Sequence, residues 1–158
     1  MTSNAAKIYL AAPLFSPMER ERNRRLRDMM SEIANVYLPQ EDGGLIFDFV
    51  RDGVPIYEAK RCVFEGDTKA IEECDIIVIV LDGRSVDEGA SFELGFAYGI
   101  GKVCVGLKTD VRSLLSFGDN PMIEGALKRV FTNDTDLIDW LRSSTSCPHA
   151  GIDVDDMG

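Results

Sequence analysis

An uninterrupted apolar run constrains the fold of this chain more than any other feature. The segment DIIVIVL, residues 75–81, places six apolar residues in a row, most of them β-branched. Because apolar and polar residues do not alternate, the run predicts a central strand that is buried on both faces. Such a strand needs a helical layer on each side, which is typical of a parallel α/β sheet.

Strand and helix patterns alternate along the rest of the chain. The patterns predict strands at 7–12, 36–38, 75–81, 102–107 and 129–132. They predict helices from residue 17 onward and at 55–73, 90–99, 121–127 and 135–142, the second of these with a break near Gly66. The expected fold is a doubly wound (Rossmann- or flavodoxin-like) α/β domain with a parallel sheet of about five strands and helices on both faces. Residues 1–142 are expected to form this single domain, and 143–158 a polar, loosely ordered tail.

The first helix has a clear start signal. Ser16 suits the N-cap, Pro17 the first helical position, and Glu19 completes a capping box. Its apolar residues recur with helical spacing and predict one buried face, made of Leu26, Met29, Met30 and Ile33. The Gly- and Asp-rich segment 40–55 is predicted to be a long loop, and such loops are often functional.

Composition excludes several functions. A formal net charge of −10 argues against nucleic acid as a partner, and the arginine cluster at 20–27 is interrupted by acids, which favours a solvated helix face. No apolar segment is long enough to cross a membrane. The cysteines, none in a CxxC pair, are expected to be buried free thiols in the reducing cytoplasm: Cys62, Cys74, Cys104 and Cys147.

The chain has a single histidine, His149, and it lies in the polar tail. Chemistry based on a histidine is therefore not expected, which leaves carboxylates as the candidate acid, base and nucleophile. With no set of His and Cys ligands, no metal is expected. The segment GFAYGIGKV does not fit a phosphate-binding loop, because Val103 stands where a hydroxyl is needed. Gly99 and Gly101 are predicted to end a helix instead, and no cofactor is expected.

Glu93 lies among apolar residues of a predicted helix, in the segment ASFELGFA. From this pattern alone, two interpretations remain open: a solvent-facing side chain, or a carboxylate held beside the ligand crevice. In the second, the nearby helix N-terminus would favour the ionised form. An ionised and partly desolvated carboxylate is what nucleophilic attack on the anomeric carbon of a sugar requires.

Three segments in the same order resemble the nucleoside 2-deoxyribosyltransferase family. They are KIYLAAPLF, the pair Asp67 and Asp75 before DIIVIVLDG, and VDEGASFELGFAYGIGK, and the resemblance spans roughly residues 7–130. It implies a double displacement without cofactor or metal. Glu93 would attack a 2′-deoxynucleoside to form a deoxyribosyl ester, and a second free nucleobase would then take the sugar.

The resemblance also implies roles for the other catalytic residues. Tyr9 matches the tyrosine that positions the nucleophile, although it could be an ordinary strand aromatic. Asp67 matches the aspartate that exchanges a proton with the departing and arriving base, although it could cap the second half of its helix.

Three further residues are implied to bind substrate. Asp87 matches the aspartate that receives the sugar 5′-hydroxyl, or is a helix cap. Phe15 matches the aromatic against the base, or is plain core. Asn120 resembles a loop residue that reaches a neighbouring subunit's site, or serves a turn before Pro121. In the first of these interpretations of Asn120, the protein is a homo-oligomer whose sites are shared between subunits.

Two rival functions remain. A related N-glycosidase of 2′-deoxynucleoside 5′-monophosphates passes the same glycosyl intermediate to water. Such hydrolases carry a serine where this chain has Asp87, whose charge would repel a phosphate, so a nucleoside substrate is favoured. The other rival is a non-catalytic module that binds nucleosides or nucleotides on the same fold.

Overall fold

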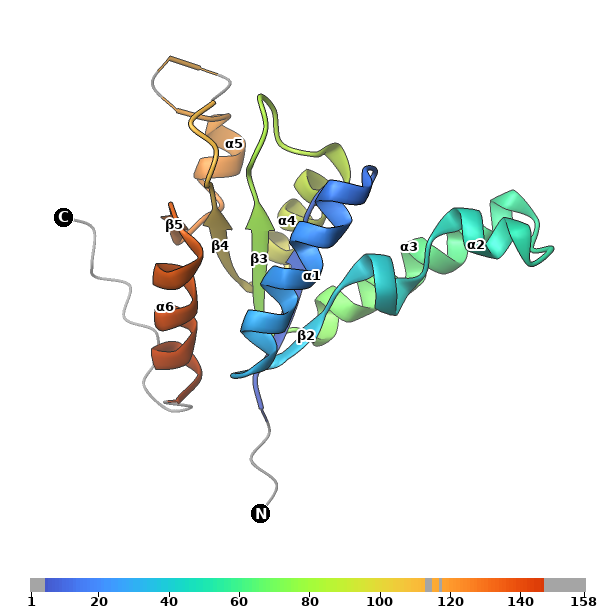
Figure 1. Ribbon diagram of the computed structural model, residues 1–158, viewed down its shortest axis with the longest axis horizontal. Helices are drawn as coiled ribbons and strands as arrows, with labels where there is room; N and C mark the ends of the chain where they lie inside the picture. Colours follow the sequence, from blue (N-terminus) through green and yellow to red (C-terminus); the bar gives the residue numbers. More distant parts are fainter. Residues whose placement is uncertain (1–4, 113–114, 117, 147–158) are drawn as a thin grey trace.

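The chain forms a five-stranded, all-parallel sheet with helices packed on both faces (Figure 1). The computed structural model describes residues 5–112, 115–116 and 118–146. The strand order is β2-β1-β3-β4-β5, which is the flavodoxin-like order, and the expected fold class is confirmed. The strands are β1 (Lys7–Ala11), β2 (Asn35–Tyr37), β3 (Ile76–Val80), β4 (Val103–Leu107) and β5 (Arg129–Phe131).

The described residues also form six α-helices and one short π-helical turn, of which all but the last helix lie between strands. The helices are α1 (Pro17–Ser31), α2 (Ile46–Arg51), α3 (Ile56–Glu73), α4 (Glu88–Gly99), α5 (Pro121–Glu124) and α6 (Asp134–Ser146), and the turn is η1 (Pro39–Gly43). Helix α6 continues past the predicted end at Arg142 to Ser146. Residues Cys147 and His149, and the tail from 147 on, lie outside the described residues.

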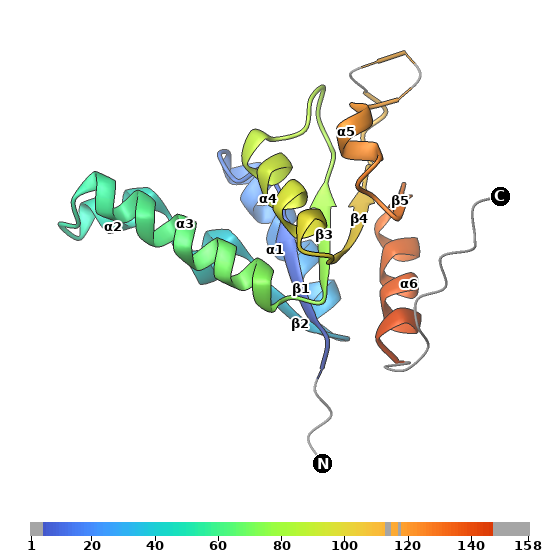
Figure 2. The same ribbon diagram turned by 180° about the vertical axis from the view of Figure 1, so that it is seen from behind.

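Alternate residues of β3 enter two separate cores. Ile76, Val78 and Val80 pack with α1 and α6 on one face, whereas Ile77 and Ile79 pack with α3 and α4 on the other. Figures 1 and 2 show these two helical layers from opposite sides. Burial of each such side chain contributes about 1.5–3 kcal/mol, so the all-apolar run makes β3 the centre of the fold. Among the described residues, no helix combines the length and apolar character needed to cross a membrane.

The start of α1 is confirmed. Ser16 accepts a hydrogen bond from the Glu19 backbone N–H, and the Glu19 carboxylate accepts one from the Ser16 N–H. The predicted apolar face is correct for Leu26 and Met30, which are buried, and wrong for Met29, which is exposed.

The segment predicted as a loop contains regular structure. It holds η1 and the six-residue α2, separated by Gly44 in a left-handed conformation (φ +80°). The glycines and aspartates of this segment favoured a loop, although it includes a short, mostly apolar helix, IFDFVR. Figures 1 and 2 show α2 and the first turns of α3 extending beyond the sheet edge formed by β2, as an arm.

Helix α3 runs without the predicted break at Gly66. A glycine inside a helix reduces its stability by about 1 kcal/mol, which packing of α3 against the sheet offsets. Asp67 therefore lies in the middle of a helix, and its interpretation as a helix cap is wrong.

The predicted burial of the cysteines is correct for two of the three described. Cys74 and Cys104 are buried free thiols beneath α3 and α4, whereas Cys62 is exposed on α3. Gly99 and Gly101 end α4 as predicted, with Gly101 at φ +78°.

Candidate active site

Tyr9 and Glu93 form a hydrogen-bonded pair between the sheet and α4. Tyr9 comes from β1 and is fully buried, and its hydroxyl donates a hydrogen bond of 2.7 Å to Oε1 of Glu93 on α4. Glu93 has its neighbours Leu94 and Ala97 in the core beneath it. The solvent-facing interpretation of Glu93 is wrong, because the carboxylate is mostly buried and held by a strand residue.

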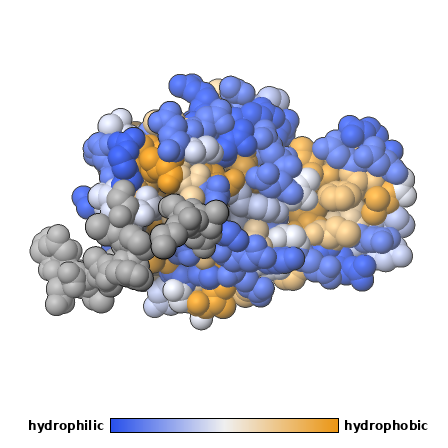
Figure 3. Space-filling model, turned by 90° about the horizontal axis from the view of Figure 1, so that it is seen from below, coloured by the Kyte–Doolittle hydropathy of each residue, from blue (hydrophilic) through white to orange (hydrophobic). Residues whose placement is uncertain are grey.

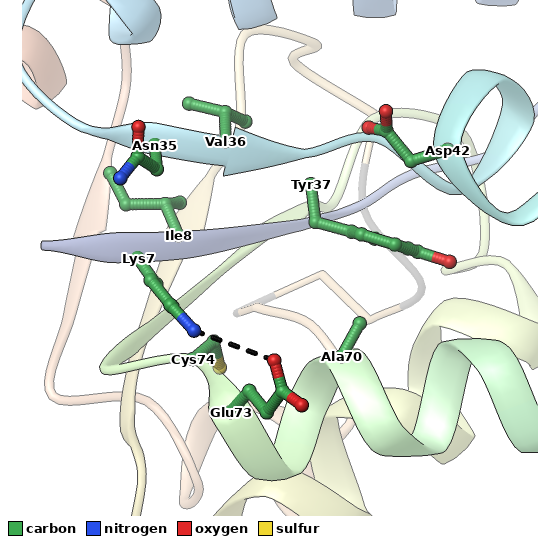
Figure 4. Close-up of a pocket in the computed structure, with 9 residues that line it drawn as sticks. All are labelled: Lys7, Ile8, Asn35, Val36, Tyr37, Asp42, Ala70, Glu73 and Cys74. Carbon is green, nitrogen blue, oxygen red and sulfur yellow. Dashed lines mark hydrogen bonds and ion pairs between the residues drawn. The ribbon is translucent and has the colours of Figure 1, made fainter.

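A second tyrosine and carboxylate lie beside the first pair. Tyr37, at the end of β2, donates a hydrogen bond of 3.0 Å to Oδ1 of Asp67 on α3. The parallel register places Tyr37 next to Tyr9, and the two rings stack with centroids 5.4 Å apart and planes 15° apart. Figure 4 shows the Tyr37 ring passing above Ala70 of α3. Two phenols from neighbouring strands thus hold two carboxylates from neighbouring helices.

A cavity of about 260 Å³ opens beside Glu93. It is enclosed by the segments that follow β1, β2 and β3, where ligands bind in open α/β sheets. Four of the sequence-predicted residues line it: Phe15, Asp67, Asp87 and Glu93. A second hollow of about 310 Å³ shares Asp67 and Glu93 with it and extends along α3. Both volumes lie near the lower end of about 300–1,000 Å³ that is usual for small-molecule sites.

Burial raises the pKa of both carboxyl groups. Desolvation raises the pKa of Glu93 to about 8, and the Tyr9 hydrogen bond opposes this while the charges of Asp67 and Asp87 add to it. Desolvation raises the pKa of Asp67 to about 6, against the hydrogen bond from Tyr37. Burial therefore opposes the ionised form of Glu93 that the helix position led us to expect. The effect of the helix dipole is confined to the first turn of a helix, and Glu93 lies beyond it.

Asp87 both caps a helix and faces the cavity. Its Oδ1 accepts a hydrogen bond of 2.9 Å from the Ala90 N–H at the start of α4. It also lines the cavity beside Glu93. The two sequence-based interpretations of Asp87, cap and pocket residue, are therefore compatible.

Phe15 is not part of the core, because 75% of it is exposed. The segment that carries it is fixed by Arg20, whose guanidinium donates to the carbonyl oxygens of Leu14 and Phe15. Arg20 itself lines the cavity. The prediction of a purely solvated face for the arginine cluster is therefore wrong for this residue.

Asn120 does not line the cavity that contains Glu93. It caps α5, where its Oδ1 accepts a hydrogen bond of 2.9 Å from the Met122 N–H. It borders a separate hollow together with Ser85, Val86 and Ser91. The turn-forming interpretation of Asn120 describes its position within one chain.

Sequence patterns missed Tyr37, Arg20 and the apolar residues from the 40–55 segment. Gly44, Leu45, Ile46 and Phe47 form one wall of the cavity. One signal could have found Tyr37: it lies in the short strand predicted at 36–38, close to the sheet edge where ligands bind. Within the described residues, no group of three or more His, Cys, Asp or Glu side chains is arranged to hold a metal ion.

The fold and this site define a class: a flavodoxin-like α/β protein with a small ligand cavity lined by carboxylates at the carboxyl end of its sheet. The family model of nucleoside 2-deoxyribosyltransferases matches residues 8–158. The chain belongs to the nucleoside 2-deoxyribosyltransferase family. Comparison with curated protein sequences gives no match.

Several solved structures are similar to this chain. A conserved protein from Enterococcus faecalis is 26% identical with a TM-score of 0.75, covering 89% of this chain and 99% of the other. A 2-deoxyribosyltransferase from Bacillus psychrosaccharolyticus is also 26% identical, with a TM-score of 0.71 and coverage of 85% and 91%. The CMP N-glycosidase of Clostridium botulinum, 18% identical, has a TM-score of 0.53 and coverage of 85% and 97%, a likeness of fold alone.

Proposed function

We propose that this protein transfers 2-deoxyribose between nucleobases of 2′-deoxynucleosides through a covalent ester on Glu93. The observation that carries the proposal is the Tyr9–Glu93 hydrogen bond at the floor of a cavity that Asp67 also lines. The likeness to the deoxyribosyltransferase of Bacillus psychrosaccharolyticus supports it. A cytoplasmic role in nucleoside salvage fits the free thiols of Cys74 and Cys104.

The proton balance of the site suits this reaction. Between pH 6 and pH 8, near the pKa values of Asp67 and Glu93, the pair holds one proton in total. Attack on the anomeric carbon by Glu93 forms the C–O bond of the ester, and the bond from the sugar to the base breaks. The proton that leaves Glu93 passes through Asp67 to the departing base nitrogen. A neutral acid and a nucleoside thus become an ester and a neutral base, with no proton drawn from solvent.

The second half of the reaction reverses these steps. A new base enters, its nitrogen attacks the anomeric carbon, and its proton returns through Asp67 to Glu93 as the ester bond breaks. Two inversions at the anomeric carbon restore its configuration, as in retaining glycosidases. Tyr9 keeps its hydroxyl on Oε1 of Glu93 and thereby fixes which oxygen is free to attack.

The remaining cavity residues suit a nucleoside. Phe15 and Phe47 present aromatic rings on which a flat base can stack, and both line the same cavity. Asp87 would accept a hydrogen bond from the 5′-hydroxyl, and its carboxylate would repel a 5′-phosphate.

Exposed apolar side chains around the cavity support the proposed homo-oligomer. They lie on the arm and on α4 and include Phe47, Val50, Ile56, Tyr57, Phe64 and Phe92. Figure 3 shows part of this surface as an orange band across the arm, at the right of the view. Because Phe47, Phe64 and Phe92 also border the two hollows, a second copy of the chain docked there would cover the site and exclude water. The proposed contribution of Asn120 to a neighbour's site belongs to the same assembly.

Hydrolysis is the second candidate function. In the single chain, Phe15 and Phe47 are 75% and 87% exposed, so solvent can reach the cavity mouth. Water that reaches the ester would release free deoxyribose instead of a new nucleoside.

One incubation distinguishes these functions. The protein is mixed with a purine 2′-deoxynucleoside and a different free base, and the products are separated by chromatography. We expect a new deoxynucleoside to accumulate, and intact-mass and peptide analysis of the quenched enzyme to find a deoxyribosyl group on Glu93. Free deoxyribose without a new nucleoside would assign the chain to hydrolysis. Absence of turnover with purine and pyrimidine nucleosides alike would leave a binding module as the function.

A further inference from the structure

Tyr37 has a contact that the double displacement described above does not use. Its hydroxyl donates to Oδ1 of Asp67 at 3.0 Å, and among the described residues no other donor approaches that carboxylate. Oδ2 therefore has no protein partner there, and Asp67 lines both hollows of the site. A side chain that must exchange a proton with two successive bases needs one oxygen anchored and the other available.

Two features hold Tyr37 in this position. Its ring stacks on Tyr9, which is fully buried, so the strand register fixes the direction of the Tyr37 hydroxyl. On the other side, Gly43 of η1 packs directly over the hydrogen bond. A Cβ atom at Gly43 would lie 2.5 Å from Oδ1 of Asp67 and 2.8 Å from the Tyr37 hydroxyl. Both distances are too short, so a side chain at this position would displace the pair.

We infer that Tyr37, enclosed by Gly43, is a positioning residue that anchors Oδ1 of Asp67 and leaves Oδ2 to exchange the proton with the nucleobase. The inference rests on the proposed function for the identity of the proton acceptor. The hydrogen bond also stabilises the ionised form of Asp67, and so opposes the effect of burial on its pKa. Other ionisable groups surround the pair: Tyr9, Asp42, Lys60, Asp87 and Glu93.

The substitution Tyr37→Phe isolates the hydroxyl. Phenylalanine keeps the stack on Tyr9, and the ring already borders an open hollow at the sheet edge (Figure 4), so no closed cavity results. We expect the pKa of Asp67, followed by NMR of its carboxyl carbon in the free protein, to rise by about one unit. In transfer assays the acid limb of the pH profile moves up with it, and kcat/KM at pH 6 falls about fivefold because the ionised fraction of Asp67 is smaller.

The matched control is Tyr98→Phe. Tyr98 lies near the carboxyl end of α4, the helix of Glu93, is 60% exposed, and should change neither measurement. A double-mutant cycle adds a second test: the effect of Tyr37→Phe on kcat/KM should vanish when Asp67 is already asparagine. Gly43→Ala should shift the Asp67 titration in the same direction as Tyr37→Phe.

Three results would overturn the inference. The first is a pKa of Asp67 that Tyr37→Phe does not change. The second is a loss of kcat/KM from Tyr37→Phe that is as large in the Asp67→Asn variant as in the wild type. The third is a pKa of Asp67 that Gly43→Ala does not change. The NMR titration needs no turnover, so it tests the contact even if the wild-type protein transfers no sugar. Failure of the proposed function and failure of this inference are therefore separable.

Discussion

The two tyrosine–carboxylate pairs of the site use the same contact at different depths. Tyr9 stands on an inner strand and is fully buried, whereas its partner Glu93 is partly buried; Tyr37 stands on the edge strand and is partly exposed, as is Asp67. The deeper carboxyl group has a pKa of about 8 and the shallower one a pKa of about 6, both raised first by desolvation. Burial therefore raises the pKa of Glu93 more than that of Asp67.

This difference separates two roles that the residue types alone do not distinguish. Both carboxylates line the two hollows, but Glu93 is held from below by the fully buried Tyr9, which suits the proposed nucleophile. The pKa of Asp67 is raised less, to about 6, which suits a group proposed to pass protons in both directions. If the roles were exchanged, the substitutions below would produce the opposite order of effects.

Glu93→Gln is expected to have the largest effect on activity. The amide keeps a hydrogen-bond acceptor for Tyr9 but cannot form the ester, so kcat should fall by at least about 10⁴-fold. Stopped assays of transfer and of hydrolysis measure this, with circular dichroism as the control for folding. Residual turnover above about 1% would contradict the nucleophile role of Glu93, and the two tyrosine–carboxylate pairs would then not differ in function as proposed.

Asp67→Asn is expected to reduce kcat/KM by about 10²–10³-fold, the usual contribution of a general acid. Asparagine retains an acceptor for Tyr37, so the geometry of the pair should survive. The loss should shrink for nucleosides whose base leaves easily without protonation. A series of deoxynucleosides with leaving bases of graded acidity checks this. The same loss across the whole series would mean that Asp67 only shapes the cavity.

The shallower pair is also where prediction from sequence was least complete. The run at 75–81 predicted the central strand, because six consecutive apolar residues fit a site buried on both faces. The motif around Glu93 and its likeness to a family indicated Glu93 and Tyr9. Tyr37 escaped notice because its contact arises from strand register, which no short pattern encodes. The raised pKa of Glu93 was also missed, since it depends on how many neighbours exclude water.

Stability should show the effect of burying Glu93. The pKa of Glu93 in the folded protein is raised above the unfolded value of 4.5. The contribution of the protonated Glu93 to the free energy of unfolding is therefore fully present below pH 4.5 and is lost as pH rises toward 8. Glu93→Gln removes this loss. At pH 9 the variant should be more stable than wild type by on the order of 5 kcal/mol, and at pH 4.5 the gap should nearly close. Urea unfolding of both proteins across this range is the measurement. A gap that stays constant with pH would show that Glu93 is not desolvated as the structure indicates.

Asp87 is the third carboxylate of the cavity, and it is held by a backbone N–H rather than by a tyrosine. Asp87→Ser tests its proposed role in choosing a nucleoside over a nucleotide. Serine is as good an N-cap as aspartate, so α4 should keep its start. Removal of the charge should lower kcat/KM for the deoxynucleoside about tenfold, through the lost charged hydrogen bond, and raise it for the 5′-monophosphate. The ratio of the two kcat/KM values is the measurement, and Glu88→Ser, one residue along at an exposed position, is the control. An unchanged ratio would restrict Asp87 to capping, and selectivity for the unphosphorylated sugar would then have to come from elsewhere in the assembly.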